Sequence, residues 1–232
     1  MNRLLKKFSL VCATIAIPML LVSCASPEQT SATPPASLYA NAAPLDLRLT
    51  KWPYPYPLKE FKTSLQGQPA SMMYMDVAAL GKPRGVVLLF HGKNFSSDYW
   101  APTIAGLSKA GYRVIAPDQI GFGKSSKPEV EYHFDDLAAN TQALLKSLNI
   151  QRVSVIANSM GGMVGIRFAR LYPQTVQKLV LENPLGLEDY SKDIPPQKNE
   201  DLLKLEMAQT ETSYRRFLQT YFPNWQPSYE SL

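Results

Sequence analysis

The stretch Val153–Gly165, VSVIANSMGGMVG, decides the fold that this sequence predicts. Its first part, Val153–Ile156, is mostly β-branched and apolar, which is typical of a buried strand. Small residues follow the strand, and a helix is expected from about Met160 to Leu171, where Pro173 stops it. The pattern therefore predicts a strand, a sharp turn that carries Ser159, and a helix.

Ser159 fits the nucleophile elbow, a motif commonly written G-x-S-x-G. In this motif the serine occupies a strained turn, so that its hydroxyl projects above the sheet. The residues two before and two after the serine must be small, because strand and helix approach closely there. Ala157 and Gly161 occupy these positions, with alanine in place of the more common first glycine. On these residues alone, a serine that caps an ordinary helix is the alternative.

The N-terminus has the pattern of a secretory signal. Three basic residues lie among the first seven, and the mostly apolar segment Phe8–Val22 follows them. Leu-Val-Ser-Cys, ending at Cys24, resembles a bacterial lipobox, in which the cysteine is lipidated and becomes the mature N-terminus. We expect a signal peptide over residues 1–23 and lipidation of Cys24. Ordinary cleavage near Ser26, or a retained anchor, is the alternative.

Lipidation of Cys24 predicts an exported protein anchored to a bacterial membrane, and Ala25 after it favours the outer membrane of a two-membrane cell. Cleavage would remove Cys12, which leaves a single, acylated cysteine and no internal disulfide. Cleavage would also remove three basic residues from a chain whose formal net charge is +5. The remaining balance gives no case for nucleic-acid binding.

Composition divides the rest of the 232-residue chain into three parts. Residues 24–58 are rich in proline, serine and alanine and predict an extended tether or a strap along the surface; a proline-rich ligand for a partner is the alternative. Residues 59–186 predict the core of one domain. Residues 187–232 predict the start of a helical cap, with short helices at Asp201–Met207 and Thr212–Phe222.

Strands and helices alternate along the predicted core, which implies an α/β fold with a mostly parallel, doubly wound sheet. The expected strands are Phe61–Leu65, Ala70–Val77, Gly85–Phe90, Tyr112–Ala116, Val153–Ile156 and Lys178–Leu181, and the expected helices are Trp100–Ala110 and Phe134–Leu148.

Three ordered motifs carry a resemblance to a known family. A buried strand runs into His91-Gly92, a second runs into the loop Pro117–Ser125 (PDQIGFGKS), and the serine elbow follows. In this order and spacing, the chain from about Phe61 onward resembles the cap-bearing α/β-hydrolases that use a serine nucleophile. The resemblance implies hydrolysis of an ester-like or related bond in a small-molecule substrate through an acyl-enzyme, with no metal or cofactor. Ester, thioester, lactone and carbon–carbon bond hydrolysis, and haloperoxidase-like activity, are all open.

The resemblance also implies roles for individual residues. Ser159 would be the nucleophile, and the backbone N–H groups of Lys93 and Met160 would bind the oxyanion. His91 would be structural and would shape the oxyanion loop. Glu182 stands where some similar haloalkane dehalogenases place their catalytic acid, so it is a candidate acid, with a simple loop carboxylate as the alternative. Those dehalogenases use aspartate at the elbow, so a serine there argues against their chemistry.

The catalytic histidine of such hydrolases follows the serine and the acid in chain order. Here no histidine follows His133, which reads as a surface residue, and Asp118 reads as closing a turn. We therefore expect a chain truncated within the cap, inactive alone, whose strand Lys178–Leu181 is an exposed edge. The alternatives are a non-catalytic, surface-anchored binding lipoprotein and a non-functional fragment.

Overall fold

The structure is a computed structural model that describes residues 43–93, 95–189, 192 and 197–221. All of these belong to the second of the two compact units of the chain, residues 41–232. The predicted signal peptide and Cys24 therefore lie outside the described residues. The elements in chain order are β1 (Leu58–Leu65), β2 (Gln68–Val77), β3 (Gly85–Phe90), the 3-10 turn η1 (Ser97–Trp100), α1 (Ala101–Lys109), β4 (Tyr112–Pro117), α2 (Phe134–Ser147), β5 (Val153–Asn158), α3 (Met160–Leu171), β6 (Val176–Glu182), α4 (Asn199–Met207) and α5 (Glu211–Tyr221).

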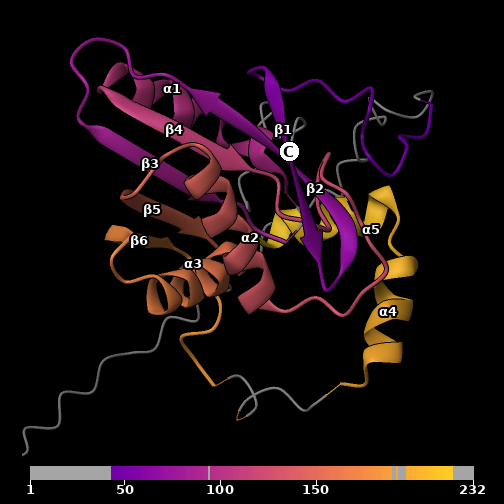
Figure 1. The fold of residues 1–232 in the computed structure, drawn as a ribbon. Helices are drawn as coiled ribbons and strands as arrows, with labels where there is room; N and C mark the ends of the chain where they lie inside the picture. The colour runs from indigo at the N-terminus through magenta and orange to yellow at the C-terminus, as the bar shows by residue number, and fades with distance from the viewer. Residues whose placement is uncertain (1–42, 94, 190–191, 193–196, 222–232) are drawn as a thin grey trace, which may run out of the picture. The chain divides into compact units, whose positions relative to one another are not determined.

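The six strands form one sheet in the order β1-β2-β4-β3-β5-β6 (Figure 1). β1 and β2 make an antiparallel hairpin around Gln66-Gly67, and β2 pairs antiparallel with β4. The other pairs are parallel, as in Leu88 beside Val155. The prediction of a mostly parallel α/β sheet is confirmed. β6 forms the edge of the sheet within the described residues, and Val180 on it is 52% exposed.

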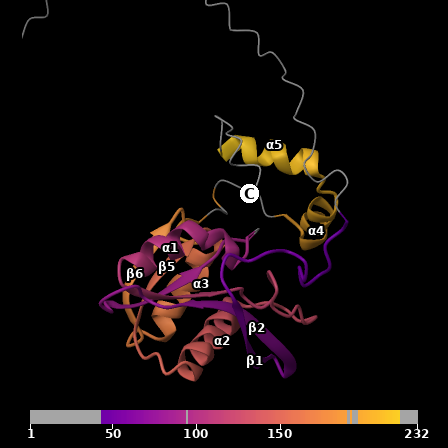
Figure 2. The same ribbon diagram turned by 90° about the horizontal axis from the view of Figure 1, so that it is seen from above.

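Side chains of the central strands alternate between two cores, one on each face of the sheet. On β3, Leu88 and Phe90 join one core with residues of α2 and α3 such as Phe168. Val87 and Leu89, which point the other way, join the second core beneath α1. Both faces of the strand are buried, which explains why its sequence GVVLLF is apolar throughout. Figure 2 shows α1 and α2 on opposite sides of the sheet.

The parallel strands bring the predicted functional residues to one edge of the sheet. β3 ends just before His91, β5 ends just before Ser159, and β6 ends with Glu182. Phe90 pairs with Ala157, and Asn158 pairs with Glu182, so the carboxyl ends of the three strands are in register. Ligand sites of open α/β sheets lie at this end of the strands.

Residues 43–57, which we call the strap, contact the core through polar side chains. The Trp52 Nε1–H donates to Asp98 Oδ2 at 2.7 Å, and the Tyr54 hydroxyl donates to Asp118 Oδ2 at 2.7 Å. Tyr54 and Tyr56 also pack against the second core. The alternating prolines keep the strap out of the sheet, because proline cannot donate a ladder hydrogen bond.

Among the helices of the described residues, none has both the length and the apolar character that a membrane crossing requires.

Candidate active site

Ser159 occupies a backbone conformation that few L-residues adopt, with φ 52° and ψ −120°. Three backbone hydrogen bonds hold this turn. The Ser159 N–H donates to Glu182 O at 3.1 Å, and the Ser159 carbonyl accepts from the N–H groups of Gly162 at 2.9 Å and Leu185 at 3.0 Å. The structure thus has the strained strand–turn–helix geometry that the sequence predicts for an elbow.

Close packing behind the turn explains the small residues around it. A Cβ on Gly161 would lie 2.4 Å from Phe90 O and 2.6 Å from His91 O. One turn further along α3, a Cβ on Gly165 would lie 3.0 Å from the Cβ of Ala157. The helix can therefore approach β3 and β5 only where side chains are absent or minimal.

His91 is fully buried and acts through both of its ring nitrogens. The Gln119 N–H donates to His91 Nε2 at 3.0 Å, so Nε2 is an acceptor. The proton of the neutral ring therefore resides on Nδ1, which donates to Gly92 O at 2.8 Å. Burial lowers the pKa of His91 below its usual value, which keeps the ring neutral. His91 thus orients the Gly92–Lys93 peptide and has no nitrogen left for proton transfer.

The orientation of the Gly92–Lys93 peptide places the Lys93 N–H, a backbone donor, near the turn at Ser159. Because no peptide bond in the described residues is cis, the Lys93 N–H points opposite to the Gly92 carbonyl, away from His91. Gly92 itself lies against the elbow, since a Cβ built on it would be 3.3 Å from Ser159 Cβ. Met160 begins α3, so its N–H has no intrahelical acceptor. The two amides of the predicted oxyanion hole thus come from segments that border Ser159.

Asp118 is a fully buried carboxylate that organises the neighbouring loop. It accepts hydrogen bonds from the N–H of Ser97 at 2.7 Å, from the N–H of Lys124 at 2.8 Å, and from the Tyr54 hydroxyl. These bonds tie the loop after β4 to the strap and to η1. Asp118 closes a turn, as predicted, and it also connects three segments that are distant in sequence.

Glu182 and His133 lie around the site without contacting the Ser159 hydroxyl. The Glu182 carboxylate is exposed, and Asn158 Nδ2 is 3.5 Å from its Oε2. His133 precedes α2, with Nε2 4.0 Å from Glu131 Oε2. Within the part of the chain that is described, neither histidine forms a hydrogen bond with Ser159 or Glu182.

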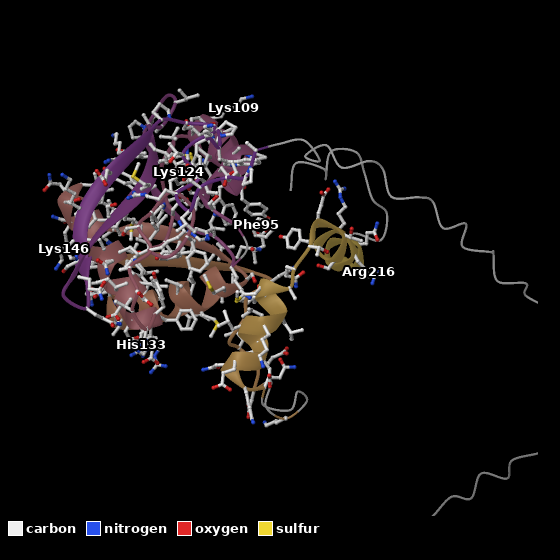
Figure 3. All side chains as sticks on the ribbon, turned by 90° about the vertical axis from the view of Figure 1, so that its right-hand side faces the viewer. Phe95, Lys109, Lys124, His133, Lys146 and Arg216 are labelled. Atoms are coloured by element: carbon white, nitrogen blue, oxygen red, sulfur yellow. The ribbon has the colours of Figure 1, made fainter. Side chains whose placement is uncertain are left out.

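Two cavities lie among the loops that follow the strands, and sequence reasoning identified neither; of the two, the smaller is lined by an elbow residue, Met160. One, of about 260 Å³, is lined by Met160 with residues that include Phe122, Tyr132 and His133. The other, of about 410 Å³, lies between the strap and the oxyanion loop, and Phe122 lines it as well. Figure 3 shows Phe95, which lines the second cavity, well apart from His133. No motif predicts these cavities, because their walls come from segments far apart in sequence.

In the described ranges, no group of three or more histidine, cysteine, aspartate or glutamate side chains is placed to hold a metal ion.

These features together are those of the α/β-hydrolase fold, and comparison with known proteins agrees. The chain belongs to the alpha/beta hydrolase fold family, whose sequence profile matches residues 85–231.

Individual relatives share this fold and differ in the reactions that their names state. A probable hydrolytic enzyme from Pseudomonas aeruginosa PAO1, known from its crystal structure, is 44% identical with a TM-score of 0.77, over 80% of this chain and 61% of that one. The 2-hydroxy-6-oxo-6-(2'-aminophenyl)hexa-2,4-dienoic acid hydrolase of Metapseudomonas resinovorans is 35% identical over 55% of this chain and 44% of its own. A haloalkane dehalogenase of Mycolicibacterium paratuberculosis is 32% identical over 52% of this chain and 40% of its own. The chain therefore spans less than half of the length of these two curated relatives, and the family leaves the reaction open.

Proposed function

We propose that this chain carries the nucleophile and the oxyanion donors of a serine hydrolase that cleaves an ester-like bond in a small-molecule substrate. The observation that carries the proposal is the strained backbone of Ser159, at φ 52° and ψ −120°, against which Gly92 packs. Strain of this kind persists where the surrounding structure enforces it, and it clusters at functional sites.

In the proposed reaction, Ser159 Oγ attacks the substrate carbonyl carbon, and its proton passes to a base. The carbonyl oxygen becomes an oxyanion, which the N–H groups of Lys93 and Met160 stabilise. One such donor is worth roughly 3 kcal/mol in the transition state. The C–O bond to the leaving alcohol then breaks as the alcohol takes up the proton. Water attacks the acyl-enzyme in the same way and releases the acid.

We propose that neither of the two histidines of the sequence serves as the base of this reaction. His91 has both nitrogens engaged, and His133 makes no hydrogen bond with Ser159. Without a base, a serine hydroxyl is a weak nucleophile at neutral pH. We therefore expect the 232-residue chain alone to hydrolyse esters at a small fraction of a complete enzyme's rate.

Hydrolysis of p-nitrophenyl acetate tests this proposal. We expect a slow rate for the chain, the same rate for His133→Ala, and a rate lower still for Ser159→Ala. Fusing the part of the Pseudomonas aeruginosa relative beyond the matched region should raise the rate strongly, and Ser159→Ala should abolish the gain. A fast rate of the chain alone that His133→Ala removes would overturn our assignment of the base. A fusion that gains nothing would favour the second candidate, a non-catalytic binding lipoprotein.

We also propose that the protein is exported and anchored to a bacterial membrane through a lipid on Cys24. The support is the basic and apolar N-terminal pattern that ends in Leu-Val-Ser-Cys. Intact mass of the protein extracted from membranes should show a chain that begins at an acylated Cys24, and Cys24→Ala should lose the acyl mass. An unmodified N-terminus, or cleavage at another residue, would contradict this proposal.

A further inference from the structure

The cavity between the strap and the oxyanion loop, which we call the strap cavity, has a mainly apolar and aromatic lining. Its volume of about 410 Å³ falls within the range of small-molecule sites, about 300–1,000 Å³. The apolar and aromatic side chains that line it are Leu45, Leu49, Trp52, Phe95, Tyr99 and Phe122.

The polar groups of the strap cavity are already engaged by protein partners. The Asp98 carboxylate accepts hydrogen bonds from the Trp52 Nε1–H and the Ser96 hydroxyl. The Lys127 ammonium donates to the carbonyls of Gly123 at 2.6 Å and Ser125 at 3.3 Å. The Lys93 ammonium, which also lines the cavity, pairs with Glu206. Because these polar groups already have protein partners, the aromatic and aliphatic side chains are the part of the lining that an apolar group can contact.

The strap cavity is linked to the proposed nucleophile through the oxyanion loop, although Ser159 itself does not line it. A Cβ built on Gly92 would lie 3.4 Å from Cδ2 of Phe95 and 3.3 Å from Cβ of Ser159. Phe95, whose ring forms one wall of the cavity, and Ser159 thus both lie against Gly92 of the oxyanion loop. On the next element, burial and the nearby charge of Glu182 raise the pKa of Tyr99, so Tyr99 connects the cavity to the end of β6.

The strap is held in place on both sides of Leu49. The Arg48 guanidinium donates to Lys124 O at 2.9 and 3.2 Å and to Ser71 Oγ at 3.3 Å. Further along, Trp52 and Tyr54 are bound to Asp98 and Asp118. The residues between these contacts therefore form a preorganised wall, which costs little ordering entropy when a ligand binds.

Leu49 stands on this wall in a backbone conformation that does not suit leucine. Its φ is 50°, in the left-handed region that glycine and asparagine occupy readily and bulky residues avoid. Leu49 nevertheless lines the cavity and is half-buried. An apolar side chain kept at a strained position is an outlier of the kind that points to a function.

We propose that the strap cavity is a substrate subsite for an apolar, ring-sized group, and that Leu49 determines its specificity. This inference rests on the proposed function, because it names the class of substrate for the same site: an ester with an aromatic or alicyclic group on one side of the reacting carbonyl. The reacting carbonyl lies over Ser159, and the ring occupies the space between Leu49, Trp52 and Phe95.

Binding of 4-nitroacetanilide to the full 232-residue chain tests the inference. This probe is an amide that mimics an aryl ester, and its nitroaryl ring quenches tryptophan fluorescence when it binds beside Trp52. We expect saturable quenching, the larger part of which Trp52→Phe removes, since Trp100 and Trp225 remain. We expect Leu49→Asn to weaken binding about tenfold, because the apolar contact of one leucine is lost. Thermal unfolding of Leu49→Asn should occur no earlier than in the wild type, since asparagine tolerates the positive φ.

Leu47→Asn is the matched control, because Leu47 is on the same strap, is 83% exposed and does not line the cavity. It should bind the probe as the wild type does. Equal binding by Leu49→Asn and the wild type, or no saturable binding by the wild type, would overturn the subsite. Ser159→Ala should bind the probe normally. If Ser159→Ala binds the probe normally while the hydrolysis test fails, the strap cavity is a binding subsite and the proposed reaction is wrong.

Discussion

The contact between α3 and β3 predicts the effect of replacing Gly161 with alanine. The new Cβ would lie 2.4 Å from Phe90 O, 2.6 Å from His91 O and 2.8 Å from Phe90 C. The first of these is about 1 Å inside the optimal separation of about 3.5 Å. All three atoms are backbone, and Phe90 is paired within the sheet, so no side chain can move aside.

Overpacking of this kind costs about 1–3 kcal/mol, and the fixed backbone favours the upper end of that range. Alanine returns about 1 kcal/mol through its better helix propensity. We therefore expect Gly161→Ala to lower the free energy of unfolding by about 2 kcal/mol, a large share of the roughly 5–15 kcal/mol that stabilises a domain. Equilibrium unfolding in urea, followed by circular dichroism, measures this change.

Gly106→Ala is the control for this prediction. Gly106 is also helical, in α1, but a Cβ built on it meets nothing within 4 Å. The same substitution should therefore stabilise the protein, by about 0.5–1 kcal/mol. If Gly161→Ala were as stable as the wild type, α3 would not pack against β3 as closely as the structure has it, and our account of the elbow would be wrong.

Two further predictions follow from burial. Since burial depresses the pKa of His91, the unfolded chain binds the proton more readily, and the free energy of unfolding should fall as pH drops below about 6.5. His91→Gln should reduce this slope, and an unchanged slope in His91→Gln would contradict a buried, neutral His91. The exposed apolar edge at β6 should bind a hydrophobic dye and favour aggregation. Val180→Lys should reduce the dye fluorescence more than the control Leu80→Lys, which changes a 64% exposed leucine outside the sheet edge. A chain that binds no dye would contradict this prediction.

The core elements could be predicted from sequence because their signals are local. Apolar runs and glycines define strands such as β3 and the helix α3, and both were predicted with the bounds that the structure has. Only boundaries shifted: β1 begins at Leu58 rather than Phe61, because the prolines that exclude strand pairing end at Pro57.

The parts of the site that could not be predicted depend on contacts between distant segments. Nothing local indicates that Trp52 meets Asp98 or that Tyr54 meets Asp118, so the strap could not be recognised as a wall of the site. The positive φ of Leu49 could not be predicted from the sequence either, because leucine is not typical of turns that require a positive φ. The elbow, in contrast, could be predicted from the sequence. The close approach of helix and strand requires its glycines, and these glycines form a recognisable motif.

The backbone of Ser159 has a consequence for how variants of this protein would be selected. Its φ of 52° and ψ of −120° match the first central position of a type II′ turn, which glycine adopts without strain. A side chain there costs about 1–3 kcal/mol. A laboratory selection for thermostability alone, without a test of activity, would therefore favour Ser159→Gly, a more stable variant that lacks the serine hydroxyl.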